Sequence, residues 1–115
     1  MTEEQRELAD RRGLRFAFDG AAEVLVEGAP GATRARVTEL SFRGCYLELP
    51  SGLKERQRVQ LKIVRSGESF EAPGEVIYVR PGGVGLVFGT VEPRFRNVLQ
   101  DWLLTELDNH REQEL

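Results

Sequence analysis

The chain has 115 residues, of which 40% are hydrophobic and 30% charged, and this fits one soluble globular domain better than two. Its formal net charge is −3, but the acidic residues gather at the ends, so residues 11–100 hold 14 basic against 10 acidic side chains. This excess is too small for a DNA- or RNA-binding protein, although it is compatible with one small anionic ligand.

The ends of the chain and the single cysteine bear on the compartment. Residues 1–10 are polar and charged, with no apolar segment of the kind that a signal peptide needs. The longest apolar runs, such as VGLVF, are too short to span a bilayer, and Cys45 alone cannot form an intramolecular disulfide. We therefore expect a cytoplasmic protein without membrane insertion.

Six short segments alternate apolar and polar residues and are separated by Gly/Pro turns, as strands are. The expected strands are residues 21–27, 33–40, 44–49, 58–65, 70–79 and 84–88. Pro73 and Gly74 interrupt the fifth segment, which predicts a bulge or an edge position there. The pattern predicts a mainly β fold, a six-stranded antiparallel β-barrel of split or Greek-key-like topology, and excludes a βαβ arrangement.

After the last strand the apolar period changes to that of a helix. The apolar stripe consists of Phe95, Val98, Leu99, Trp102, Leu103 and Leu107. We expect a C-terminal helix over residues 93–109, following a polar leader (1–10) inside a domain of residues 11–109 and preceding an acidic tail (110–115). The stripe covers an open end or face of the barrel, or else a partner helix, so a monomer and a homodimer both stay open.

Residues for catalysis are scarce. His110 is the only histidine and lies in the polar tail, so a Ser–His–acid triad and an ordinary zinc site are both unsupported. The glycines of residues 82–85 lead into a strand, not into the helix that a dinucleotide fingerprint needs. We predict a binding module with no catalytic residues, no metal and no cofactor.

Two short stretches point instead to a ligand. Arg11, Arg12 and Arg15 lie in RRGLR, and guanidinium groups bind phosphate bidentately and stack on purines. In the second stretch, ELSFRG, Ser41 offers a hydroxyl and Gly44 allows a close approach. Taken separately, the first is more typical of a solvated charged turn and the second of a β-turn.

Together and in this order, the two stretches resemble the PilZ domain family, whose binding signature is RxxxR followed by (D/N)xSxxG. Residues 11–15 match the first part, and residues 39–44 match the second except that Glu39 replaces Asp or Asn. The segment GVGLVF also resembles the last barrel strand of that family. The resemblance extends from about Arg11 to Leu104.

The resemblance implies that the protein binds cyclic di-GMP, with Arg11 and Arg15, the two arginines of RxxxR, gripping the ligand; Arg12, beside Arg11, is a further candidate contact. Ser41 would hydrogen-bond the ligand and Gly44 would leave room, while the N-terminal loop closes against the barrel. Glu39 still accepts hydrogen bonds, but its longer side chain has one more rotor to immobilise.

Three hypotheses follow. In the first, the protein is a cyclic di-GMP receptor that passes the signal in trans, through its RxxxR loop, to an unidentified protein partner. The alternative is a PilZ-like protein–protein interaction module that does not bind the nucleotide. The third is a structural barrel without a ligand. The arginines favour the first, because an interaction module has no need of RxxxR beside the Ser/Gly stretch.

Overall fold

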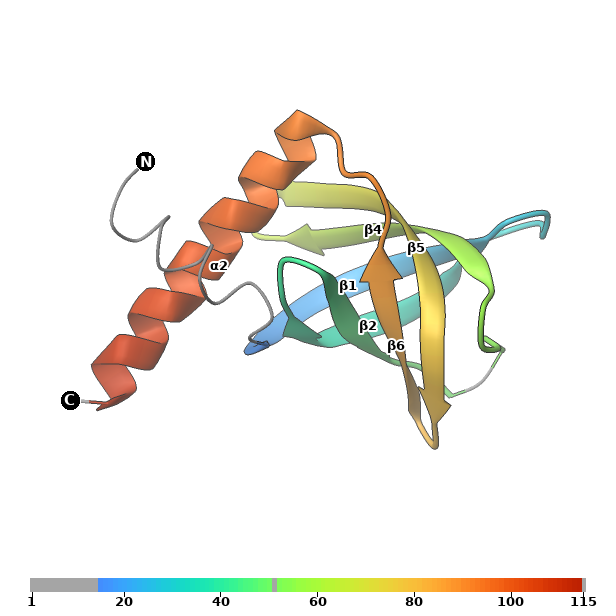
Figure 1. The fold of residues 1–115 in the computed structure, drawn as a ribbon, viewed down its shortest axis with the longest axis horizontal. Helices are drawn as coiled ribbons and strands as arrows, with labels where there is room; N and C mark the ends of the chain where they lie inside the picture. The colour runs from blue at the N-terminus through green and yellow to red at the C-terminus, as the bar shows by residue number, and fades with distance from the viewer. Residues whose placement is uncertain (1–14, 51, 115) are drawn as a thin grey trace.

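The computed structural model describes residues 15–50 and 52–114, with side chains up to residue 109. These residues form six strands followed by one helix (Figure 1). The elements are β1 (Phe16–Val26), β2 (Thr33–Leu40), β3 (Gly44–Glu48), β4 (Arg58–Arg65), β5 (Glu68–Arg80), β6 (Gly83–Phe88) and α2 (Pro93–Glu114).

The six strands close into one antiparallel barrel in the order β1-β2-β3-β6-β5-β4, and β4 pairs back onto β1. Sequence neighbours pair through short turns, except that β3 lies beside β6 and β4 beside β1. The predicted fold class, a six-stranded antiparallel barrel with a C-terminal helix, is confirmed.

In β1, β4 and most of β5, every second residue faces the barrel interior, as the alternation predicts. In β4 the inward residues are Val59, Leu61 and Ile63, each at most 2% exposed. β1 follows the same rule but begins at Phe16, earlier than the expected residue 21. Its first half carries an irregularity between Ala17 and Gly20, where the pairing with β2 shifts register.

The irregularity in β5 lies elsewhere than its sequence suggests. Pairing with β4 runs without a shift through Pro73, and the bulge falls between Val76 and Tyr78, on the side of β6. On the side of β6, the pairing ends at Gly74, which lies opposite Phe88. Pro73 therefore faces Gly89, just beyond β6, and the N–H of Gly89 donates to the Pro73 carbonyl at 2.8 Å. The proline therefore occupies an edge position, where its missing N–H removes no ladder hydrogen bond.

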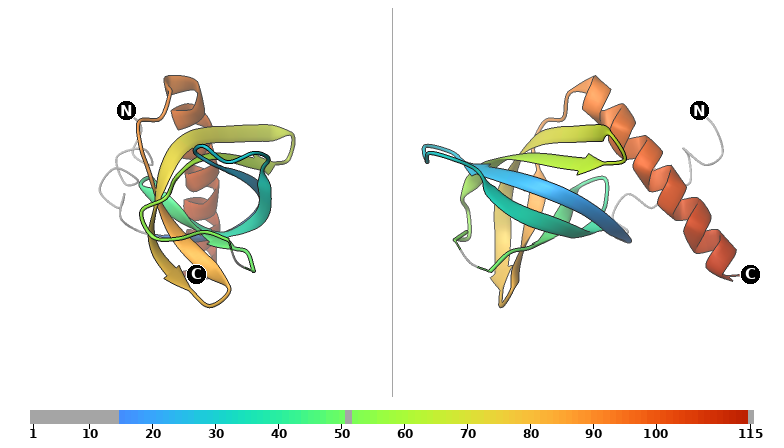
Figure 2. Two further views of the ribbon diagram at one scale, coloured as in Figure 1. Left: turned by 90° about the vertical axis from the view of Figure 1, so that its right-hand side faces the viewer. Right: turned by 180° about the vertical axis from the view of Figure 1, so that it is seen from behind.

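The helix α2 crosses one end of the barrel, opposite the tip of the β1–β2 hairpin (Figures 1 and 2). Its Trp102 ring packs on Phe18 of β1 with 5.4 Å between ring centroids. Phe95, in the first turns of the helix, meets Phe70 of β5 edge-on at 6.5 Å. The apolar stripe is thus buried against the barrel of the same chain, one of the two arrangements expected.

A partly buried ion pair adds to this docking. Arg65, the last residue of β4, donates to Glu106 of α2 at 2.9 Å, and its guanidinium lies 4.3 Å from the centroid of the Phe18 ring. α2 continues past Asn109 to Glu114, through most of the segment expected to be a separate tail. No helix in the described part of the chain is both long and apolar enough to cross a membrane.

Candidate functional site

The pairing of β1 with β2 brings the two halves of the signature together. Phe16 lies opposite Leu40 and Ala17 opposite Glu39 in this antiparallel register. Arg15 directly precedes β1, so it lies at the same end of the sheet as Ser41, which directly follows β2. Arg11 and Arg12 fall outside the described residues, and their part in the site stays a prediction.

Ser41 closes the turn between β2 and β3. Its hydroxyl oxygen accepts the N–H groups of Arg43 and Gly44, both at 3.2 Å, and its own N–H donates to the Gly44 carbonyl at 2.9 Å. The side chain is 5% exposed. The geometry is that of the β-turn which the sequence also allowed, and a hydrogen bond from Ser41 to a ligand stays a prediction.

Gly44 is needed for the packing of the sheet. A Cβ atom at this position would lie 1.9 Å from the carbonyl oxygen of Leu86 on β6, much closer than any side chain can approach. The bare backbone therefore allows β3 and β6 to pair, and a role in leaving room for a ligand stays a prediction.

Glu39 belongs to a row of residues that crosses the outside of the barrel. Glu39 lies opposite Tyr46 of β3, and Tyr46 lies opposite Gly85 of β6. On the other side of β6, Gly85 lies opposite Tyr78 of β5. Glu39 and both tyrosines are half-buried. The row places a carboxylate and two aromatic rings on the same outer face as Arg15.

Tyr46 of β3 and Tyr78 of β5, hereafter the tyrosine pair, lie flat on β6, the strand between them. A Cβ atom at Gly85 would lie 2.3 Å from the Tyr78 ring, and one at Gly83 would lie 2.2 Å from the hydroxyl of Tyr46. The two rings are close to parallel, with 27° between their planes and 6.3 Å between centroids. The glycines of β6 thus make space for aromatic rings from both neighbouring strands.

Two arginines contact this tyrosine pair. Nη1 of Arg15 donates to the hydroxyl of Tyr78 at 2.9 Å, and the guanidinium of Arg80 lies 4.6 Å from the centroid of the same ring. The hydrogen bond to Tyr78 raises the pKa of Arg15, partial burial opposes it, and the charge of Glu39 adds to the rise. Arg15 is therefore a fixed positive charge beside a carboxylate and an aromatic surface.

The sequence reasoning did not single out Tyr46, Tyr78 or Arg80. They share no motif, because strand register alone brings them together. A usable signal was present in GVGLVF, where glycines at alternate positions leave one face of a strand without side chains. Such a face needs a covering from its neighbours, and tyrosine is the large residue that tolerates a half-exposed position.

Cys45 lies on the inner side of β3 and is 3% exposed. Burial raises the pKa of its thiol to about 12, although the nearby charge of Arg15 opposes the shift. The thiol is therefore protonated at neutral pH and packs as a small hydrophobic residue, as expected.

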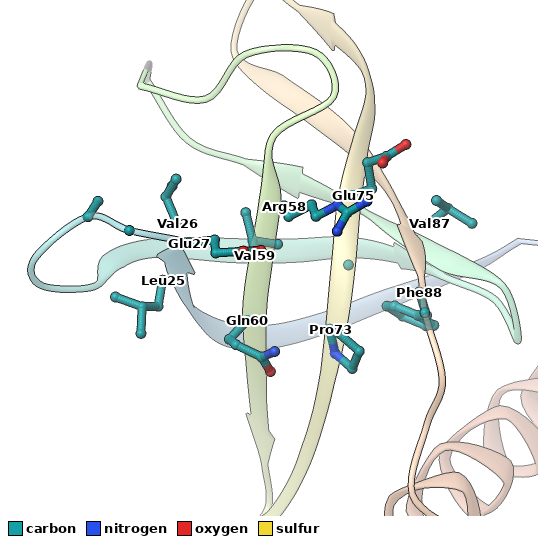
Figure 3. Close-up of a pocket in the computed structure, with 14 residues that line it drawn as sticks. Leu25, Val26, Glu27, Arg58, Val59, Gln60, Pro73, Glu75, Val87 and Phe88 are labelled. Carbon is teal, nitrogen blue, oxygen red and sulfur yellow. The ribbon is translucent and has the colours of Figure 1, made fainter.

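Two of the depressions on the outside of the barrel bear on the position of the site. A shallow one of about 500 Å³ adjoins the tyrosine pair and is lined by Arg36, Tyr46, Glu48, Leu49, Pro50, Pro81 and Gly82. A groove of about 640 Å³ lies over β4, β5 and the ends of β1 and β6, with Gln60, Pro73 and Phe88 among its walls (Figure 3). Neither lining includes Arg15, Glu39, Ser41 or Gly44, but the shallow depression reaches the outer face of the site through Tyr46, whereas the groove does not.

Comparison with known protein families decides the relationship. The family model described as "PilZ domain" matches residues 9–105. The chain belongs to the PilZ domain family. Within this PilZ domain the match includes Arg15, Glu39, Ser41 and Gly44, and no curated protein matches the chain.

Solved PilZ structures share the fold at low sequence identity. The PilZ domain of YcgR from Escherichia coli, solved with c-di-GMP, is 17% identical, with a TM-score of 0.71 over 88% of this chain and 94% of that one. The PilZ domain of CeSA from a cellulose-synthesizing bacterium is 18% identical, with a TM-score of 0.63 over 83% and 98%. The inhibitor of motility MotI/DgrA from Bacillus subtilis is 14% identical, with a TM-score of 0.71 over 85% of this chain and 51% of that one.

Proposed function

We propose that this PilZ domain is a cyclic di-GMP receptor that acts on a protein partner in trans, in the cytoplasm, through its N-terminal RxxxR segment. The observation that carries the proposal is the register of β1 and β2, which places Arg15 beside the Glu39–Gly44 stretch. Family membership and the c-di-GMP complex of the YcgR PilZ domain support it. The domain acts by binding, not by catalysis.

Each residue has a definite part in this proposal. A guanidinium group has five N–H donors, and Arg15 uses one on Tyr78, which leaves the others for a phosphate. Glu39 accepts hydrogen bonds from the N–H edge of a guanine. Arg11 and Arg12 provide the second positive group from the N-terminal side, and the turn closed by Ser41 holds Glu39 and Gly44 in place.

The test is calorimetry with cyclic di-GMP on the wild type and on Arg15→Ala. A hydrogen bond to a charged group contributes about 1.5–3 kcal/mol, so the variant should bind at least about tenfold more weakly. Arg34→Ala is the matched control, because Arg34 is an equally exposed arginine on β2 that pairs with Glu23 on β1. Equal affinity of Arg15→Ala and wild type, or no binding by the wild type, would overturn the proposal.

The alternative is a protein–protein interaction module that does not bind the nucleotide. Two observations favour it: the Ser41 hydroxyl is already used by its own turn, and Glu39 replaces the family's Asp or Asn. Titration of Glu39→Asp separates the two functions. If the longer side chain weakens a real site, the shorter acid should bind cyclic di-GMP more tightly, whereas an interaction module binds it in neither form.

A further inference from the structure

We propose that the hydroxyl of Tyr78 is a positioning group that holds Arg15 on the barrel surface in the geometry that the anionic ligand needs. The inference deepens the proposed function and rests on it. It starts from one contact, the 2.9 Å hydrogen bond from Nη1 of Arg15 to the Tyr78 hydroxyl, which joins residues 63 positions apart.

Arg15 needs a group that fixes the direction of its side chain before the ligand binds. It directly precedes β1, it is exposed, and a free arginine side chain loses conformational entropy when a ligand immobilises it. A hydrogen bond formed before the ligand arrives pays part of that entropy in advance, and preorganisation of this kind increases affinity. The Tyr78 hydroxyl is the partner that fixes the direction of the Arg15 side chain in the described structure.

Tyr78 is itself held rigidly. One face of its ring lies on Gly85, where even a Cβ atom would lie 2.3 Å away, and the guanidinium of Arg80 lies 4.6 Å from its centroid. The bulge between Val76 and Tyr78 sets the direction in which the residue leaves β5, as bulges beside binding sites do. The hydroxyl therefore has a position that the barrel determines.

A phenol suits this task better than a carboxylate. Arg36, also on the outer face, bonds the Asp19 carboxylate at 3.0 Å, and that pair has no net charge to offer a phosphate. Tyr78 accepts a hydrogen bond without neutralising Arg15, so the positive charge stays available. The chemistry matches a ligand that carries phosphate.

The experiment is a double-mutant cycle measured by calorimetry with cyclic di-GMP. Tyr78→Phe keeps the ring and removes the hydroxyl, and we expect it to weaken binding by about three- to tenfold. In the Arg15→Ala background the same change should have no effect, because the group it positions is gone. Thr105→Val, which removes an exposed hydroxyl that bonds the Asp101 carbonyl within α2, should bind like the wild type.

Other results would overturn the inference. Unchanged or tighter binding by Tyr78→Phe, or an equal loss in both backgrounds, excludes a positioning role while leaving the receptor function standing. If the wild type does not bind, the receptor function fails. NMR of the ligand-free protein then still tests whether the Tyr78 hydroxyl fixes the Arg15 side chain. A guanidinium resonance of Arg15 that is distinct in the wild type and averaged in Tyr78→Phe supports it, and identical spectra exclude it.

Discussion

Two aromatic clusters on the same barrel differ in what their rings face. At the end covered by α2, Phe70 of β5 is 0% exposed and packs against Phe88 and Phe95. On the outer face, Tyr78 of the same strand lies on the bare backbone of Gly85, has the guanidinium of Arg80 over its ring, and accepts a hydrogen bond from Arg15 at its hydroxyl. The first cluster is fully covered and stabilises the fold, whereas the second is half-buried and is the surface at which we propose that the ligand binds.

The strongest test of this contrast is Phe70→Ala. Truncating a fully buried phenylalanine costs about 3–5 kcal/mol of unfolding free energy, from lost burial and the cavity left behind. Ile77→Ala on the same strand is the control, because Ile77 is 46% exposed and should cost less than about 1 kcal/mol. Urea denaturation measures both, and equal losses at the two positions would mean that the helix-covered end is not the packed core.

A smaller effect on folding, and a clear one on binding, is expected from Gly85→Ala. The new methyl group meets the Tyr78 ring, so the ring has to move and Arg15 loses its partner. Affinity for cyclic di-GMP should fall at least as far as in Tyr78→Phe, while unfolding free energy falls by about 1 kcal/mol.

A Tyr78→Ala background shows whether Gly85→Ala lowers affinity by displacing the Tyr78 ring. In Tyr78→Ala, the methyl group at position 85 has no ring to displace, so the further loss of affinity should disappear. Calorimetry on the double variant is the measurement, and an undiminished loss would place the effect in the strand itself.

The smallest effect concerns Cys45 and shows only in alkaline solution. Burial raises the pKa of its thiol from 9.0 to about 12, so above pH 9 the unfolded thiol ionises while the folded one does not. The thiol's contribution to stability is intact below pH 9 and is lost as pH rises toward 12, by at most roughly 1.4 kcal/mol per pH unit.

Cys45→Ala is the control for the other groups that titrate in this range. The wild type should lose more unfolding free energy than the variant between pH 9 and pH 11, as measured by urea denaturation at each pH. Parallel pH profiles would show that the thiol ionises equally easily in the folded and unfolded chain.

Strong periodicity made most of the fold predictable. In β4 the alternation of Val59, Leu61 and Ile63 is uninterrupted, and the helical stripe from Phe95 to Leu107 has no competing pattern. The first half of β1 was missed because Gly20, the next inward position after Phe16 and Phe18, adds no side chain to their alternation, and because the strand is irregular between Ala17 and Gly20.

The site was predictable only where a motif marks it. Arg15, Ser41 and Gly44 follow a family pattern and Glu39 departs from it, although the structure also gives Ser41 and Gly44 local roles: Ser41 closes a turn, and Gly44 lets β3 approach the carbonyl of Leu86. Tyr78 could not be found in this way. Its importance depends on which residues β5 and β6 place opposite each other, and the bulge after Val76 shifts that register by an amount that the sequence does not display.

The glycines beneath the tyrosine pair have an evolutionary consequence. Position 85 has no room for a methyl group while position 78 carries a ring, and removing the ring first leaves a strip of peptide backbone uncovered. Either single change is unfavourable, so the two positions should covary among related barrels and be inherited as a unit.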